Sequence, residues 1–152
     1  MAAVSDELIL ADAVKLVNEG MAVTLLVRGR SMLPFILGGI DSVVLTRPGE
    51  IRRGDVVLAR IADKRYVLHR VMEVSPERVE LMGDGNLVGR EVCRPDDVLA
   101  RADEVVRGDG RHCRLDTPRQ RRLARLWRRL LPIRRYLLFI YKHTLIRNKN
   151  IQ

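Results

Sequence analysis

The middle of the chain consists of short runs rich in Val, Leu and Ile. Turn signals that contain Gly, Pro or Asp separate these runs, as in Arg47-Pro48-Gly49 and Ser75-Pro76-Glu77. Short strands at close spacing, with no long helix between them, predict a mainly β fold with an antiparallel, coiled sheet rather than alternating strand–helix units. The predicted strands cover residues 22–27, 42–46, 56–61, 66–74, 79–82 and 98–106.

A helical pattern precedes the strands. Ser5 or Asp6 is the expected N-cap, and the Asn18-Glu19-Gly20 segment predicts the helix end, since glycine commonly follows a C-terminus. An apolar face with helical spacing is expected to pack on the sheet, formed by Leu10, Ala13, Val14 and Val17.

A second helical region follows the last strand. Thr117-Pro118 opens a predicted helix over residues 119–131, which Pro132 ends or kinks. One face is expected to carry its apolar residues, Leu123, Leu126, Trp127 and Leu130, and a further apolar cluster covers residues 136–141. We therefore divide the chain into a β domain at residues 1–106, with its core at 21–106, and a tail at residues 107–152.

Charge separates these two parts. The whole chain has a formal charge of +9, but residues 1–106 hold 14 Lys and Arg against 17 Asp and Glu, a net of −3. Residues 107–152 hold 14 against 2, a net of +12. A basic, amphipathic tail predicts contact with an anionic membrane surface through the segment from Arg119 to Lys142, with Trp127 at headgroup depth. Docking on a partner protein is the close alternative, and nucleic acid is disfavoured because the tail lacks a recognised fold for it.

Composition excludes other classes. No window reaches the roughly 18 consecutive apolar residues that a spanning helix needs, and no N-terminal signal peptide is visible. We therefore expect a cytoplasmic protein or one that lies peripherally on a membrane. Cys93 and Cys113 lack metal-ligand or CxxC spacing, so unpaired thiols are expected. No metal or cofactor is predicted.

Four local motifs occur in order on this framework: Ser31-Met32-Leu33-Pro34, Arg53-Gly54-Asp55-Val56-Val57, Leu68-His69-Arg70-Val71 and Gly83-Asp84-Gly85-Asn86. In this order the chain resembles the signal peptidase I family, within the wider group of serine peptidases that includes the LexA-like self-cleaving repressors. The resemblance covers roughly residues 21–106. It implies a nucleophile at Ser31, a histidine base at His69 of the archaeal and endoplasmic-reticulum type, and an acidic residue at Asp84.

Chemistry supports these roles. A serine hydroxyl needs a neighbouring base to take its proton, and a neutral histidine can accept that proton and return it to the leaving amine. A carboxylate on the far ring nitrogen orients the imidazole. The family's further acidic positions after its GD motif are missing here, so the third member is Asp84, Glu91 or neither.

Two other features of the site are predicted. Gly29 stands where many bacterial relatives carry a serine as oxyanion donor, so the backbone N–H of Ser31 is expected to serve. Met32, Leu33 and Phe35, with Ile36, are candidates for a shallow substrate groove, and core packing is the alternative for each of them.

The resulting prediction is a serine endopeptidase that cleaves a signal or leader peptide through an acyl-enzyme on Ser31. The alternative is a non-catalytic peptide-binding module on the same fold, recruited to a membrane or partner by its tail. A LexA-like self-cleaving regulator is disfavoured, since position 69 is not lysine and no helix-turn-helix precedes the β domain.

Overall fold

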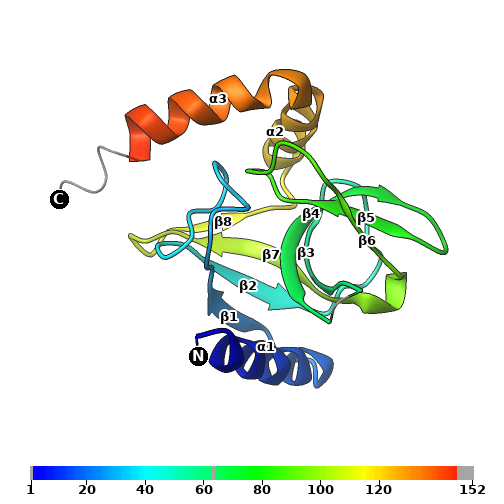
Figure 1. Ribbon diagram of the computed structural model, residues 1–152. Coiled ribbons are helices and arrows are strands. Elements are labelled where there is room, and N and C mark those ends of the chain that lie inside the picture. The colour runs from blue at the N-terminus through cyan, green and yellow to red at the C-terminus, as the bar shows by residue number, and fades with distance from the viewer. Residues whose placement is uncertain (1, 63, 147–152) are drawn as a thin grey trace.

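The computed structural model describes residues 2–62 and 64–146, which form a coiled β-sheet with helices at both ends of the chain (Figure 1). Helix α1 spans Ala2–Asn18. The strands are β1 Val23–Leu26, β2 Ser42–Thr46, β3 Val56–Arg60, β4 Tyr66–Val74, β5 Val79–Met82, β6 Glu91–Cys93, β7 Val98–Val106 and β8 His112–Arg114. The short 3₁₀ helix η1, Pro95–Asp97, precedes β7.

The described strands form one sheet in the order β1-β2-β7-β3-β4-β5-β6, and β8 pairs with β7. Every strand pair is antiparallel, and register shifts occur in β2–β7, β3–β7 and β4–β5. Such irregularities bend strands and increase their twist, which lets the sheet coil. The predicted mainly β fold class is confirmed.

Four of the six predicted strands have the predicted bounds; the first is one residue shorter at each end, and the third ends one residue earlier. Strands β6 and β8 were not predicted, because three residues are too few to show an alternating pattern. Residues 107–111 form the turn between β7 and β8, in which the Arg107 N–H donates to the Arg111 carbonyl and the Gly110 N–H donates to the Arg107 carbonyl, each at 2.8 Å. The sheet therefore continues beyond residue 106.

Two apolar clusters cover the two faces of the sheet. The first includes Val17 of α1, Met32, Ile36 and Leu58, and the second is centred on Val57, Val71 and Leu81. The predicted apolar face of α1 packs on the first cluster, as expected. The predicted N-cap of α1 was wrong: the helix begins at Ala2, so Ser5 and Asp6 lie inside it. It ends as predicted, with Gly20 at φ +93°.

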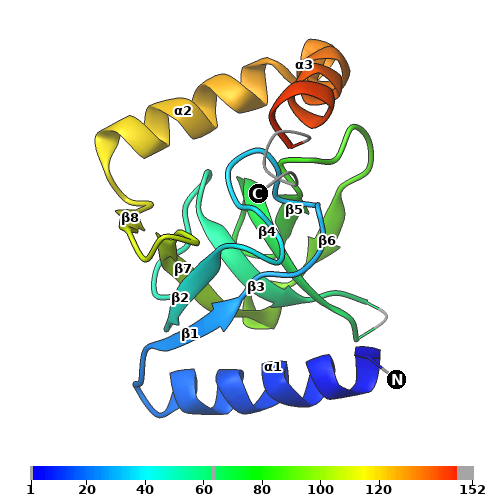
Figure 2. The same ribbon diagram turned by 90° about the vertical axis from the view of Figure 1, so that its left-hand side faces the viewer.

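The C-terminal region forms helix α2, Pro118–Arg129, the 3₁₀ helix η2, Leu131–Ile133, and helix α3, Arg134–Tyr141. Thr117 caps α2 by accepting a hydrogen bond from the Gln120 N–H, and Pro132 lies in the break between the two helices, as predicted. A π-helical turn, η3, Lys142–Ile146, ends the described chain. Figure 2 shows α2 and α3 on the side of the sheet opposite α1.

The four apolar residues that helical spacing groups on one face of α2 differ in burial. The Trp127 side chain is only 8% exposed and faces the sheet, whereas Leu126 is 52% exposed and faces outward. The indole has both a large apolar surface and an N–H that needs a partner, and it finds both on the β domain. Trp127 therefore does not lie at headgroup depth.

Among the helices of the described residues, none has the length and apolar character needed to cross a bilayer.

Candidate active site

Ser31 lies in a loop between β1 and β2 whose two ends are joined by hydrogen bonds. We call residues 27–41 the Ser31 loop. The Val27 N–H donates to the Asp41 carbonyl at 2.9 Å, and the Gly39 N–H donates to the Val27 carbonyl at 2.7 Å. The buried Asp41 carboxylate accepts from the Leu37 N–H at 2.9 Å and from Arg107 at 2.8 Å. These bonds fix the conformation that presents Ser31, which is half-buried.

A second loop, Gly83-Asp84-Gly85-Asn86, packs directly against Ser31, and we call it the GDGN loop. The Gly85 N–H donates to the Ser31 carbonyl at 2.8 Å. A Cβ atom at Gly83 would lie 2.4 Å from the Ser31 carbonyl oxygen, and one at Gly85 would lie 2.5 Å from that of Arg30. The backbones approach so closely that only glycine fits at either position.

His69 of β4 and Glu91 of β6 form a close pair. The His69 Nδ1 atom lies 2.7 Å from Glu91 Oε2, with the two side chains 7% and 24% exposed. Strand pairing accounts for their meeting, since β5 joins β4, which carries His69, to β6, which begins at Glu91. A carboxylate at Nδ1 favours the tautomer with the proton on that nitrogen and directs Nε2 to a different partner.

Asp84 has a different partner. Its two carboxylate oxygens accept from Arg70 Nε at 2.8 Å and from Arg70 Nη2 at 2.7 Å, and both side chains are buried. Arg70 also donates to the Gly54 carbonyl at 2.8 Å. Since neighbours in a strand point to opposite faces, Arg70 and His69 lie on opposite sides of β4. The structure therefore brings Glu91, and not Asp84, to His69.

Ser31 and His69 are not joined directly. Within residues 2–62 and 64–146, no hydrogen bond links the Ser31 hydroxyl to the His69 imidazole. The imidazole is instead hydrogen-bonded to Glu91. In unliganded peptidases the catalytic hydrogen bond is often long and tightens only with substrate. The pairing of these two groups stays a prediction.

The predicted substrate groove was wrong for Met32 and Leu33. Their side chains are 1% and 3% exposed and lie in the core, because the loop turns them inward beneath Ser31. Phe35 packs edge-on against Trp127, with 5.8 Å between ring centroids, and beneath the Arg70 guanidinium. Ile36 is also buried in the core. Core packing, the alternative for these residues, is what the structure has.

An open apolar cavity lies elsewhere, between α1 and the sheet. It has a volume of about 480 Å³. Its walls include Leu25, Leu26 and Val27, which lead into the Ser31 loop, and Leu68, which precedes His69. The cavity therefore borders the segment that leads into the Ser31 loop, but it lies on the face of β4 opposite the His69 side chain, because neighbours in a strand point to opposite faces.

Comparison with known proteins assigns this region to a family. The Peptidase S24-like family matches residues 2–102, about two thirds of the chain. The chain belongs to the Peptidase S24-like family. No curated protein and no solved structure matches the chain. The family belongs to the LexA and signal peptidase superfamily, so membership supports a serine peptidase type of function and agrees with the coiled β fold.

The matched S24-like region ends before the tail, yet the tail contacts the site. The Trp127 indole N–H donates to the Asp84 carbonyl at 2.9 Å. Arg134, 1% exposed, donates to the Asn86 carbonyl at 3.1 Å and to the Trp127 carbonyl at 3.2 Å. Burial lowers the pKa of Arg134, and the nearby Asp84 carboxylate counters that effect. Sequence analysis missed both contacts; the only signal was that Trp127 is the sole tryptophan.

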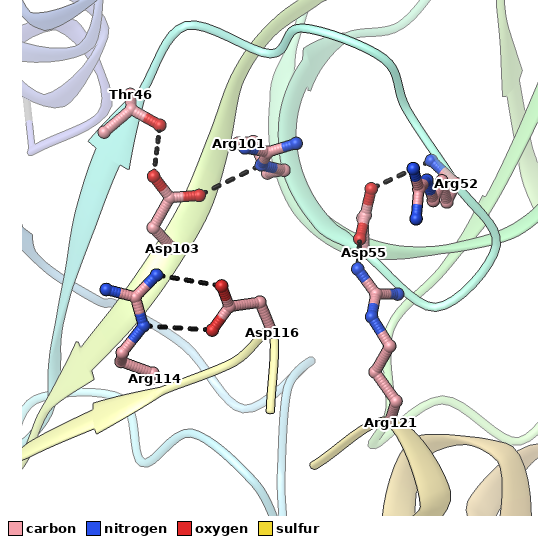
Figure 3. A network of polar contacts seen from close by, with 8 residues as sticks. All are labelled: Thr46, Arg52, Asp55, Arg101, Asp103, Arg114, Asp116 and Arg121. Carbon is pink, nitrogen blue, oxygen red and sulfur yellow. Dashed lines mark hydrogen bonds and ion pairs between the residues drawn. The ribbon is translucent and has the colours of Figure 1, made fainter. Parts of the chain in front are cut away.

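A polar network fixes the start of α2 to the S24-like sheet (Figure 3). The buried Asp55 carboxylate accepts from Arg121 of α2 at 2.8 Å and from the Arg52 N–H at 2.8 Å. Asp55 and Arg121 line a polar cavity of about 360 Å³ together with two further pairs, Arg101–Asp103 and Arg114–Asp116. Thr46 also donates to Asp103. The guanidinium groups of Arg101, Arg114 and Arg121 each donate to a carboxylate, so we assign the network a structural role.

The two cysteines lie outside the candidate catalytic groups. Both cysteines are free thiols, and burial raises the pKa of Cys93 to about 11. Within the described residues, no three His, Cys, Asp or Glu side chains are grouped so as to hold a metal ion.

Proposed function

We propose that this S24-like chain is a serine endopeptidase with Ser31 as nucleophile, His69 as general base and Glu91 as the residue that orients the base. The observation that carries the proposal is the partly buried contact of 2.7 Å between His69 Nδ1 and Glu91 Oε2. It supplies the third group that the GD motif does not supply, since Asp84 is engaged by Arg70. The hydrogen bond at Nδ1 leaves Nε2 to exchange a proton with the serine.

The reaction proceeds in two halves. The Ser31 hydroxyl proton moves to His69 Nε2 as Oγ forms a bond to the scissile carbonyl carbon, and the carbonyl oxygen becomes an oxyanion. Backbone N–H groups, chiefly that of Ser31, stabilise this charge. The imidazolium, stabilised by ionised Glu91, then gives its proton to the leaving amine as the C–N bond breaks. Water, deprotonated by the same nitrogen, attacks the acyl-enzyme and releases Ser31.

The substrate we propose is an extended signal or leader peptide. Strand β1 is a sheet edge that pairs only with β2 in the described chain, and edge strands bind extended peptides by adding a strand. The 480 Å³ apolar cavity beside Leu25 and Leu26 supplies space for substrate side chains. This arrangement suits a segment with small or apolar residues near the scissile bond.

The test is cleavage of candidate leader peptides, read by intact-mass spectrometry. Ser31→Ala and His69→Ala are each expected to abolish cleavage and leave the circular dichroism spectrum unchanged. The chain contains its own control, because His112 and Glu104 form a similar pair at 2.9 Å on the surface, with His112 60% exposed. His112→Ala is expected to cleave normally. Unchanged cleavage in Ser31→Ala or His69→Ala would overturn the mechanism.

A second candidate is a non-catalytic peptide-binding module, favoured because no hydrogen bond joins the Ser31 hydroxyl to His69 in the described residues. A serine-reactive acylating probe distinguishes the two functions. Labelling of Ser31 that disappears in His69→Ala supports the peptidase. A folded protein that binds leader peptides and stays unlabelled supports the module, and spontaneous fragments of the chain itself would indicate self-cleavage.

A further inference from the structure

The tail presents two parallel rows of side chains away from the sheet. In a helix, residues three and four apart lie side by side. Leu123, Leu126 and Leu130 therefore form one row along α2, and Leu123 and Leu126 are exposed. Three exposed arginines with the same spacing form the neighbouring row: Arg122, Arg125 and Arg129.

Helix α3 extends this surface. Tyr136, Phe139 and Ile140 are 65%, 61% and 57% exposed, although they are large apolar or aromatic residues. Their helical neighbours Arg134 and Leu138 are buried and hold α3 to the protein. Tyr141, at the end of α3, is half-buried, and burial and then the nearby Asp41 carboxylate raise its pKa. We call the outward-facing residues of α2 and α3 the tail face.

We propose that the tail face docks on the surface of an anionic lipid bilayer. A helix with an apolar row beside a row of basic residues lies in the plane of a membrane interface, with the apolar side chains among the acyl chains and the cations at the phosphates. Arginine is suited to this position because its aliphatic stem packs on apolar groups while its guanidinium reaches the headgroups. The net charge of +12 in residues 107–152 supplies the attraction.

Lipid fits this surface better than nucleic acid does. Phosphate binding along a nucleic acid needs basic and polar contacts. Nucleic-acid binding does not explain why Leu126, Tyr136, Phe139 and Ile140 are all exposed on consecutive helices. An isolated exposed apolar residue is ordinary, but several large ones on two consecutive helices indicate a binding surface.

The opposite side of the same helices sets the orientation of the bound protein. Trp127 and Arg134 bind the carbonyls of Asp84 and Asn86, so the tail face and the GDGN loop are held on two sides of one rigid element. A docked tail therefore holds the Ser31 loop close to the bilayer. Lipid binding does not require catalysis, so it stands or falls separately from the proposed peptidase.

Flotation of the full chain with phosphatidylcholine vesicles, with and without phosphatidylglycerol, tests this proposal. Binding is expected only with phosphatidylglycerol, and it is expected to weaken as ionic strength rises from about 0.1 M to about 1 M, because the screening length falls from about 10 Å to about 3 Å. Each arginine near an anionic surface contributes roughly a five-fold change in partitioning. Arg122, Arg125 and Arg129 changed together to Gln are expected to weaken binding by about 100-fold.

Matched variants separate the tail face from total charge and apolar content. The triple variant of Arg60, Arg78 and Arg94 to Gln changes the charge equally on the β domain, and it is expected to bind vesicles normally. Leu126→Glu with Phe139→Glu is expected to abolish binding, whereas Leu8→Glu, at a 63% exposed apolar site on α1, is expected to retain it. Circular dichroism verifies folding for each variant.

Three outcomes overturn the proposal. One is the absence of binding to anionic vesicles by the wild-type chain. Another is loss of binding in the arginine variant alone, with full binding by Leu126→Glu/Phe139→Glu, which shows adsorption by charge without insertion. The third is tight binding to duplex DNA with no binding to vesicles.

Discussion

The indole N–H of Trp127 donates a hydrogen bond of 2.9 Å to the carbonyl oxygen of Asp84. This bond joins a helix outside the S24-like match to the loop that supports Ser31. The Phe35 ring contacts the same indole from the Ser31 loop, so one side chain contacts both loops of the candidate site. The basic tail is therefore part of the site's supporting structure.

Trp127→Phe tests this support. The substitution keeps an aromatic ring against Phe35 but leaves the buried Asp84 carbonyl without its partner, which costs about 1–3 kcal/mol in the free energy of unfolding. We expect a loss of this size in urea denaturation followed by circular dichroism, together with weaker labelling of Ser31. Leu126→Ala, in the same helix but exposed, is the control and is expected to change stability by less than about 0.5 kcal/mol. Equal losses in both variants would mean that the Asp84 contact contributes nothing specific.

Neutralising Asp84 is expected to lower stability, whereas neutralising Glu91 is expected to lower the cleavage rate. Asp84→Asn leaves the buried Arg70 guanidinium without a counter-charge, so we expect the free energy of unfolding to fall by about 3–5 kcal/mol. Glu91→Gln offers an amide in place of the carboxylate and favours the wrong histidine tautomer. We expect it to reduce cleavage by about 10²- to 10⁴-fold, with a stability loss of only about 1 kcal/mol.

Paired measurements of thermal unfolding and cleavage distinguish these roles, with Glu104→Gln beside the exposed His112 as the control for Glu91→Gln. If Asp84→Asn folds normally and is inactive while Glu91→Gln is active, the third member is Asp84 and our assignment is reversed.

The fold was predictable because burial in a coiled sheet imposes a local pattern. Residues 66–74 and 98–106 are long enough for their β character to be read directly, and their bounds match. The three-residue strands β6 and β8 were not predictable in this way, because pairing with a neighbour, rather than their own composition, makes them strands.

The candidate site was predicted only in part for a related reason. Sequence motifs selected Ser31 and His69 as candidates, but the partner of His69 depends on which strands lie side by side. Asp84 stands next to glycines in a familiar motif, whereas Glu91 reaches His69 only because β5 pairs with both β4 and β6. Likewise, helical spacing grouped Trp127 with Leu126, but it does not indicate which side of a helix faces the protein.

Cys93 gives a pH-dependent prediction. Burial, followed by the nearby Asp97, raises its pKa from an ordinary 9.0 to about 11. In the folded protein the thiol therefore stays protonated between these values while the unfolded chain loses its proton. Because the unfolded state then binds fewer protons, stability falls as pH rises from about 9 to about 11. We expect Cys93→Ala to show a smaller fall over this window in urea denaturation.

Alkylation of the folded protein gives an independent check. Cys93 is expected to react slowly with iodoacetamide at pH 8, and its rate is expected to rise by about ten-fold per pH unit up to its pKa, since the thiolate is the reactive form. Modification at pH 8 as fast as in the urea-unfolded chain would contradict the raised pKa.

Gly83 tests whether the GDGN loop sets the position of Ser31. A methyl group there would lie 2.4 Å from the Ser31 carbonyl oxygen, a distance that forces one backbone to move. We expect Gly83→Ala to reduce acylation of Ser31 by more than about ten-fold, because small displacements of catalytic groups are costly in rate. The measurement is the labelling rate with a serine-reactive probe, beside the unfolding midpoint.

Gly110→Ala is the matched control for this experiment. Gly110 has φ +88° but no atom within 4 Å of an added Cβ, so alanine there costs about 1 kcal/mol of backbone strain without touching the Ser31 loop. Its labelling rate is expected to equal that of the wild type at a temperature where both are folded. If the two variants lose stability equally and both keep the wild-type labelling rate, the close approach of Gly83 to Ser31 is a packing feature and does not position the nucleophile.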